Sequence, residues 1–258
     1  MSYPALDLTG RVAVVIGATS GLGRAIALGF AQAGADVVGT GRRAALVDEL
    51  ASAIEAEGRR TRRIAIDATA ESELERLLAE CVETLGSVDI LVNAAGITKR
   101  APSVSMPEAD WQAIMDTNLS GTMRACRVFG RHMIDRRYGR IVNIASLTSH
   151  VGFYEVAAYA ASKGAVAALT RSLAVEWAMH GVCVNALVPG VFRTPLNSGL
   201  LDGTARGREL LTRTPMGRFG DAEDLVGAAV FLASESARFV TGHLLAVDGG
   251  FLASGVNV

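Results

Sequence analysis

Short apolar runs rich in β-branched residues alternate with longer segments of helical periodicity along this chain. Such runs are typical of buried strands, and a glycine such as Gly34 is typical of a helix end. The pattern predicts seven strands, at residues 11–16, 36–40, 61–66, 89–93, 139–146, 182–188 and 244–247. It predicts helices at residues 21–34, 44–57, 71–85, 105–133, 156–179 and near 221–234. The spacing of Ser105 and Glu108 predicts a capping box at the start of the fourth helix.

Strands that alternate with helices of about ten or more residues form parallel sheets with right-handed crossovers. We therefore expect the chain, 1–258, to form a single doubly wound α/β domain of the Rossmann type, with a seven-stranded parallel sheet and helices on both faces. Ligands of such sheets bind beyond the carboxyl ends of the strands. The turns from strand to helix are therefore the place to look for a functional site.

The composition excludes several classes of protein. Basic and acidic side chains number 25 and 26, a net charge of −1, so nothing attracts nucleic acid. No apolar stretch approaches the roughly 18 residues that span a bilayer, and the N-terminus lacks the pattern of a signal peptide. Cys81, Cys126 and Cys183 are widely spaced, and the four histidines share no metal-ligand spacing. We expect a cytoplasmic protein without a metal site and without a nucleic-acid or membrane partner.

A glycine-rich turn follows the first predicted strand and opens the first helix. Glycines at its start and end allow a tight turn and a close approach of the backbone to a pyrophosphate, and the helix N-terminus offers free N–H groups. An ordinary glycine turn is the alternative, but its place after the first strand favours nucleotide binding. The expected phosphate contacts are Gly17, Thr19, Ser20, Gly21, Leu22 and Gly23.

The second turn indicates which cofactor is bound. Sites for NAD place an acidic residue near the end of the second strand, whereas here Gly41 is followed by Arg42 and Arg43. A guanidinium at Arg42 can pair with a 2′-phosphate, so the sequence favours NADP and leaves NAD possible. The alternative is that both arginines are merely solvated. Asp67, at the end of the third predicted strand, is placed to accept a bond from adenine or to cap a helix.

Three polar residues around the fifth predicted strand indicate acid–base chemistry. Tyr159 and Lys163 lie four residues apart at the start of a helix, which places them on one face, and Ser146 ends the preceding strand. A nearby ammonium lowers the pKa of a phenol, and a serine hydroxyl can hold a substrate oxygen. A tyrosine and an exposed lysine share this spacing by chance in many helices, but the glycine turn favours a catalytic role.

These motifs, in this order, resemble those of a short-chain dehydrogenase/reductase from Leu8 to about Phe251. The other matching motifs are Asn93-Ala94-Ala95-Gly96, Asp116-Thr117-Asn118, residues 184–190 and Asp248-Gly249-Gly250. Ile16 replaces the threonine that usually precedes the first glycine, and Ala94 replaces a usual asparagine.

The resemblance implies a role for each residue. Tyr159 would be the general acid/base, Ser146 would orient the substrate oxygen, Lys163 would bind the nicotinamide ribose and lower the pKa of Tyr159, and Asn118 would hold a proton-relay water. The further cofactor contacts would be Ala68, Asn93, Ala94, Gly96, Pro189, Gly190, Val191 and Thr194. The family also implies a homotetramer built on the helices at 105–133 and 156–179 and the C-terminal segment.

The segment at about 190–215 is expected to close over the substrate. Lys99 precedes Arg100, and the expected substrate contacts, besides Ser146 and Tyr159, are Arg100, His150, Tyr154 and Asn197. Such groups suit a sugar acid or polyol. Residues 145–149 and 194–200 are most similar to the gluconate 5-dehydrogenases and 2-deoxygluconate 3-dehydrogenases of the family.

Two other functions stay open. A 3-oxoacyl-[acyl-carrier-protein] reductase shares nearly all of these motifs; Arg137 fits one arginine that would dock the carrier, but His180 stands where a second is expected. A nucleotide-sensing regulator without catalysis is a third possibility, and the intact polar catalytic positions argue against it. The expected reaction is therefore the interconversion of a secondary alcohol and a ketone with NADP(H).

Overall fold

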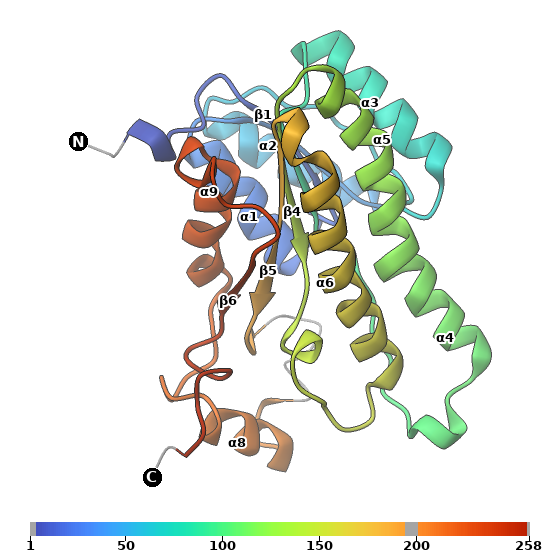
Figure 1. Cartoon of the computed structure of the whole chain (residues 1–258). Coiled ribbons are helices and arrows are strands. Elements are labelled where there is room, and N and C mark those ends of the chain that lie inside the picture. Colours follow the sequence, from blue (N-terminus) through green and yellow to red (C-terminus); the bar gives the residue numbers. More distant parts are fainter. Residues whose placement is uncertain (1–3, 194–200, 257–258) are drawn as a thin grey trace.

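A computed structural model describes residues 4–193 and 201–256 of the chain. Six parallel strands form one sheet in the order β2-β1-β3-β4-β5-β6 (Figure 1). Their bounds are β1 Val12–Ile16, β2 Asp36–Thr40, β3 Ile90–Asn93, β4 Gly139–Ile144, β5 Val182–Pro189 and β6 Leu244–Val247. The predicted parallel α/β sheet is confirmed. Because the chain crosses from β1 first to β2 and later to β3 on its other side, the carboxyl end of β1 is a switch point of the topology.

The predicted strand at 61–66 is not formed, so the prediction of seven strands was wrong. This segment runs beside β2, with one backbone bond at each end, from Val37 N to Arg60 O (3.1 Å) and from Ile66 N to Gly41 O (3.1 Å). Between them the carbonyl of Ile64 accepts a hydrogen bond from a side chain, the hydroxyl of Thr40. A side chain therefore takes the place of a backbone donor, which interrupts the ladder.

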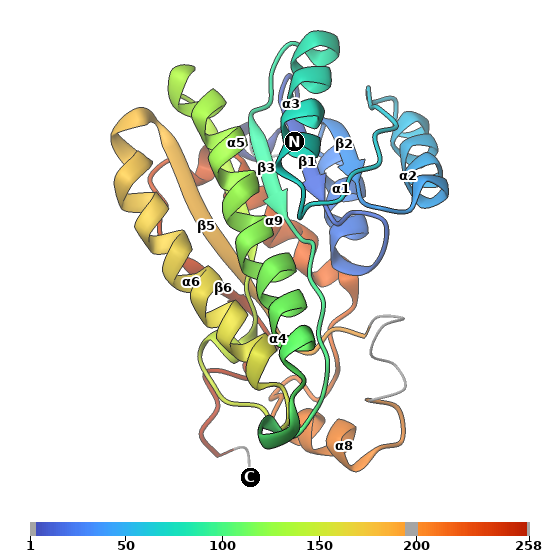
Figure 2. The same ribbon diagram turned by 90° about the vertical axis from the view of Figure 1, so that its right-hand side faces the viewer.

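Helices cover both faces of the sheet, as predicted (Figures 1 and 2). On one face lie α1 (Gly21–Gln32), α2 (Ala44–Ala56) and α9 (Val226–Ala233), and on the other α3 (Glu71–Leu85), α5 (Gly121–Asp135) and α6 (Ala157–Trp177). In β1, Val14 packs toward the α3, α5 and α6 side and Val15 toward the α1 and α9 side. Strands buried on both faces explain the continuous apolar runs of the sequence.

The fourth predicted helix is interrupted by a π turn. Helix α4 (Glu108–Met115) continues through a π-helical turn at Asp116–Ser120 into α5. The predicted capping box is absent: Pro107 is the N-cap, and the Ser105 hydroxyl instead donates to the carbonyl of Pro102 (3.3 Å). Single π turns are frequent at functional sites, and this one carries the buried Asn118.

Helices α5 and α6 touch through a glycine and a tryptophan. A Cβ atom on Gly130 would lie 2.6 Å from the indole of Trp177, which is buried with 7% of its surface exposed. Trp177 is therefore a packing residue between the two helices. The close approach makes these two helices one layer over β3, β4 and β5.

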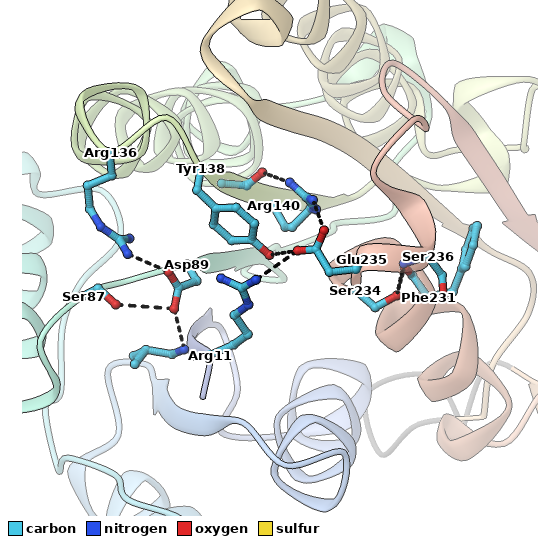
Figure 3. A network of polar contacts seen from close by, with 12 residues as sticks. Arg11, Ser87, Asp89, Arg136, Tyr138, Arg140, Phe231, Ser234, Glu235 and Ser236 are labelled. Atoms are coloured by element: carbon cyan, nitrogen blue, oxygen red, sulfur yellow. Dashed lines mark hydrogen bonds and ion pairs between the residues drawn. The ribbon is translucent and has the colours of Figure 1, made fainter. Parts of the chain in front are cut away.

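A charged network joins the amino-terminal ends of the strands, opposite the end where ligands are expected (Figure 3). Glu235 accepts hydrogen bonds from Arg11 (3.0 Å), the hydroxyl of Tyr138 (2.8 Å) and Arg140 (3.4 Å). The two guanidinium groups also lie over the ring of Tyr138, at 4.0 and 4.6 Å from its centroid. The network connects the starts of β1 and β4 to the turn after α9.

The described helices include none that combines the length and the apolar character needed to cross a membrane. In the same part of the chain, no cluster of three or more His, Cys, Asp or Glu side chains is arranged to hold a metal ion.

Candidate active site

The turn between β1 and α1 is shaped for close backbone contacts. Gly17 has a φ of +85°, and a Cβ atom there would lie 2.4 Å from the backbone nitrogen of Ala95. A Cβ atom on Gly23 would lie 2.3 Å from the carbonyl oxygen of Gly17. Ser20 is the N-cap of α1 but its side chain makes no capping bond, so no side chain of the turn blocks the first N–H groups. The turn therefore fits a pyrophosphate at the helix N-terminus.

In the turn between β2 and α2, Arg43 is the arginine that contacts the glycine-rich turn. Its Nη2 atom donates to the hydroxyls of Thr19 (3.1 Å) and Ser20 (3.2 Å). Arg42 lies instead near Asp67, where its charge contributes to lowering the pKa of that carboxyl. Sequence reasoning singled out Arg42. The extended backbone of Arg43, the N-cap of α2, sends the two adjacent side chains to different places.

Asp67 is used in a local turn. Its Oδ1 atom accepts hydrogen bonds from the backbone N–H (2.9 Å) and the hydroxyl (2.8 Å) of Thr69, which lower its pKa. The alternative of a helix N-cap is not realised, because α3 begins after Ala70. The carbonyl of Ala68 packs against Gly121, at the start of α5.

Ser146, Tyr159 and Lys163 lie together at the carboxyl end of β4. Ser146 follows that strand, and its side chain is hydrogen-bonded to the phenol of Tyr159. The Nζ atom of Lys163 lies 5.8 Å from the centre of the Tyr159 ring and donates to the carbonyl of Ile144 at 2.6 Å. The predicted spacing therefore brings the phenol and the ammonium to one face of α6.

Burial dominates the electrostatics of this group. It raises the pKa of Tyr159, and the hydrogen bond with Ser146 offsets part of this rise. Burial lowers the pKa of Lys163 to about 8. The phenol is therefore protonated at neutral pH in this structure, and a lowering of its pKa by Lys163 stays a prediction for the cofactor-bound state.

Protein groups use both N–H donors of the Asn118 side chain and one of the two acceptor sites of its oxygen. The side chain accepts from the backbone N–H of Ile97 (2.8 Å) and donates to the carbonyl of Ile97 (2.9 Å) and to Ser162 (3.0 Å). Ser162 in turn donates to the carbonyl of Tyr159 at 2.7 Å. A relay water at this amide would therefore have to donate a hydrogen bond to Oδ1, which keeps one free acceptor site. Sequence reasoning missed Ser162, although it lies within the tyrosine–lysine motif.

Small residues and a buried amide line the end of β3. The side chain of Asn93 points into the core and donates to Asn143 at 2.9 Å, so only its backbone faces the site. Ala94 continues the pairing with β1 through a bond to Ile16. A Cβ atom on Gly96 would lie 3.6 Å from the Nζ atom of Lys163. Gly96 therefore leaves room above the lysine.

The end of β5 forms the other side of the site. Gly190, after Pro189, bonds to Val247 (2.8 Å), and a Cβ atom on it would lie 2.5 Å from the Cα atom of Asp248. Gly190 and Val191 line a cavity of about 380 Å³ that extends to Met216. Two expected contacts, Thr194 and Asn197, lie outside the described residues.

The expected substrate residues Arg100, His150 and Tyr154 are exposed, and several charged groups in this region are already paired. Arg100 forms an ion pair with Glu155 at 2.6 Å. Lys99 pairs with Asp110, and the carbonyl of Tyr154 accepts a bond from Arg206 (3.2 Å). His150 and the side chain of Tyr154 are exposed.

Comparison with known proteins identifies the family. The model of the family described as Enoyl-(Acyl carrier protein) reductase matches residues 17–252. The 2-dehydro-3-deoxy-D-gluconate 5-dehydrogenase of Bacillus subtilis is 42% identical over 250 residues, 97% of this chain and 98% of that protein. The chain belongs to the short-chain dehydrogenase/reductase family. The resemblance inferred from the motifs is confirmed.

Other members of this short-chain dehydrogenase/reductase family are similarly close. The gluconate 5-dehydrogenase of Gluconobacter oxydans is 41% identical over 98% of this chain and 100% of its own length. The crystal structure of a gluconate 5-dehydrogenase from Burkholderia cenocepacia in complex with NADP and tartrate is 39% identical, with a TM-score of 0.94 over 97% of this chain and 98% of that one. The chain is therefore an oxidoreductase of this family.

Proposed function

We propose that this enzyme interconverts a secondary alcohol and a ketone of a sugar acid by hydride transfer with NADP(H). The observation that carries the proposal is the group of Ser146, Tyr159 and Lys163, at the same edge of the sheet as the glycine turn. Relatives named for gluconate and 2-dehydro-3-deoxygluconate, similar over nearly the whole chain, support the substrate class over an acyl carrier protein.

The residues present fit NADP. When bound, NADPH would supply the hydride in reduction and NADP⁺ would accept it in oxidation. The backbone of the turn 17–23 would hold the pyrophosphate, and Arg43 with Arg42 would hold the 2′-phosphate, because no acidic residue lies at the end of β2 to repel it. Asp67 and Ala68 would border the adenine. The nicotinamide half would be bordered by Asn93, Ala94, Gly96, Lys163, Pro189, Gly190, Val191 and Thr194.

The proton is handled by Tyr159. In reduction its phenol gives a proton to the substrate oxygen, and in oxidation the phenolate takes one. Ser146 donates a second hydrogen bond to that oxygen. The Ile144 carbonyl occupies one of the three N–H donors of Lys163, which leaves two for the ribose. Since both N–H donors of the Asn118 side chain are in use, a relay water would donate to its Oδ1 atom or bind through the main chain of the π turn.

The residues expected to contact the substrate carry groups that suit a polar molecule. The guanidinium of Arg100 would bind the carboxylate of the sugar acid. His150, Tyr154 and Asn197 would bind its hydroxyls. His150 and Tyr154 are exposed, so their side chains are free to contact a substrate when it binds.

We also propose a homotetramer, the arrangement expected from the family. Val175 and Met179, on and just after α6, are 82% and 89% exposed, which leaves apolar surface for a neighbouring subunit. A monomer in light scattering at micromolar concentration would contradict this assembly. The cytoplasmic location stays a prediction.

The function is tested by a comparison of substrates. The purified enzyme is assayed with 5-ketogluconate, other keto sugar acids and an acetoacetyl thioester, each with NADPH and with NADH. We expect turnover of a keto sugar acid with NADPH. Turnover of the thioester without any keto sugar acid would replace the proposal with the fatty-acid function.

A further inference from the structure

Glu155 has a backbone conformation that residues with a side chain rarely adopt. Its φ is +63°, and among the described residues other than glycine only Arg137, at +55°, shares the left-handed region. Strained residues persist where surrounding contacts over-determine them, and they cluster at functional sites. Glu155 lies in the turn before α6, four residues before Tyr159.

Two contacts join this turn to the segment 97–101. The carboxylate of Glu155 lies 2.6 Å from the Nε atom of Arg100, and its carbonyl accepts a hydrogen bond from the backbone N–H of Ala101 at 3.0 Å. In the described part of the chain, Glu155 is the only acidic side chain paired with Arg100. With Glu155 at Nε, the terminal nitrogens of the guanidinium can face a second carboxylate.

The start of the same segment is fixed to the same part of α6. Asn118 binds both backbone groups of Ile97 and donates to Ser162, which lies one residue before Lys163 on α6. The segment 97–101 is therefore joined to the stretch of chain that carries the phenol directly at Ala101 and through Asn118 at Ile97. These attachments fix the backbone on both sides of Arg100 relative to the start of α6, and the contact with Glu155 then restrains its guanidinium.

We propose that Glu155 is a positioning residue that orients Arg100 toward the substrate carboxylate. It thereby sets the distance between that carboxylate and the carbon that reacts. The proposal rests on the function proposed above. The Arg100 side chain is 43% exposed and that of Glu155 is 19% exposed. An ion pair with one such exposed partner adds little stability, and the left-handed backbone costs a comparable amount. The pair is therefore of little use for folding, whereas a fixed guanidinium is of direct use for binding.

The first test compares a charged substrate with an uncharged one. In Glu155→Gln we expect the KM for 5-ketogluconate to rise roughly tenfold with kcat little changed, because ground-state binding is lost. The KM for a neutral keto-sugar should stay the same. Arg100→Ala should have a larger effect, and adding Glu155→Gln to it should cost nothing more, since residues acting through one another are not additive.

The second test separates positioning from a structural role. Glu155→Gly relieves the backbone strain, so we expect its Tm to rise by about 2 °C while the KM for 5-ketogluconate rises as in Glu155→Gln. Arg137→Gly is the matched control, with the same strain relieved and an unchanged KM. A fall in the Tm of Glu155→Gly with equal losses for both substrates would show a structural role and overturn the proposal.

The two proposals fail in different ways. If the wild-type enzyme reduces no keto sugar acid, the proposed function falls, and the positioning role falls with it. If the wild-type enzyme reduces 5-ketogluconate but Glu155→Gln has an unchanged KM, the positioning role alone is overturned.

Discussion

The guanidinium of Arg43 lies 3.1 Å from the hydroxyl of Thr19. This hydrogen bond connects the turn after β2 to the glycine-rich turn after β1. The charge of the neighbouring Arg42 acts instead on Asp67, whose pKa it helps to lower. A 2′-phosphate on a ribose held at the end of β2 would lie between these two turns. The two adjacent arginines therefore form a natural pair of variants for testing which one recognises it.

Arg43→Ala should weaken binding of NADPH by roughly 1.5–3 kcal/mol, the range of a charge-assisted hydrogen bond, and leave NADH little affected. Arg42→Ala is the matched control and should lose less. Titration of both cofactors into each variant by calorimetry gives the comparison. A larger loss of NADPH affinity in Arg42→Ala would reverse the assignment.

Tyr159→Phe should abolish turnover and leave cofactor binding intact, because the ring stays and only the ionisable oxygen is removed. Near-normal turnover would refute the role of the phenol. Cofactor affinity, measured in the same preparation, shows whether the fold of the site is preserved.

The direction of the reaction should depend on pH through the same phenol. Burial raises the pKa of Tyr159, so the phenol is protonated at neutral pH and suited to donate. Oxidation needs the phenolate, so its rate should rise with pH, about tenfold per unit below the apparent pKa, while reduction should fall above it. Profiles of kcat/KM against pH in both directions test this. A flat profile for oxidation would contradict it.

Lys163→Met should stabilise the cofactor-free protein at neutral pH. Burial lowers the pKa of Lys163 from 10.5 to about 8, so between these values the unfolded chain binds more protons and stability rises with pH. Below about pH 8 the folded protein bears the full cost of burying the charged ammonium, roughly 3 kcal/mol for a pKa shift of this size. Urea unfolding at neutral and alkaline pH should show an advantage of Lys163→Met that shrinks as pH rises. The exposed Lys99→Met is the control.

Glu235→Gln should lower the free energy of unfolding without changing the kinetics. It removes the charge that faces Arg11 and the buried Arg140, and a buried charge left without its partner costs about 1–3 kcal/mol or more. The network lies at the end of the sheet opposite the site, so kcat and KM should be unchanged. Glu55→Gln, in an exposed pair with Arg63, should have no measurable effect.

The sequence predicted the sheet well because strands buried on both faces leave an unmistakable apolar pattern. The segment 61–66 has the same pattern, since Ile64 and Ile66 are buried, but the hydroxyl of Thr40 breaks its pairing. The apolar composition of a segment predicts that it is buried, whereas its hydrogen-bond partners depend on the segments that fold beside it. The predicted capping box at Ser105 is absent for the same reason, because the Ser105 hydroxyl donates its hydrogen bond to the nearby carbonyl of Pro102.

The grouping of the three residues proposed for catalysis was predictable, and the placement of the arginines proposed for binding was less so. Ser146, Tyr159 and Lys163 are fixed by short spacings within a strand, a turn and a helix. The choice between adjacent arginines depends on backbone angles that their identities do not reveal. No local signal predicts a left-handed glutamate, so the role of Glu155 could come only from the structure.

The contact between Gly130 and Trp177 gives the protein a built-in optical probe. The chain has only two tryptophans, and Trp177 is the one enclosed where α5 meets α6. Any separation of these helices would admit water to the indole and shift its fluorescence to longer wavelength. With Trp111 replaced by phenylalanine, emission from this single residue would follow the opening of that helix layer in real time, without a label.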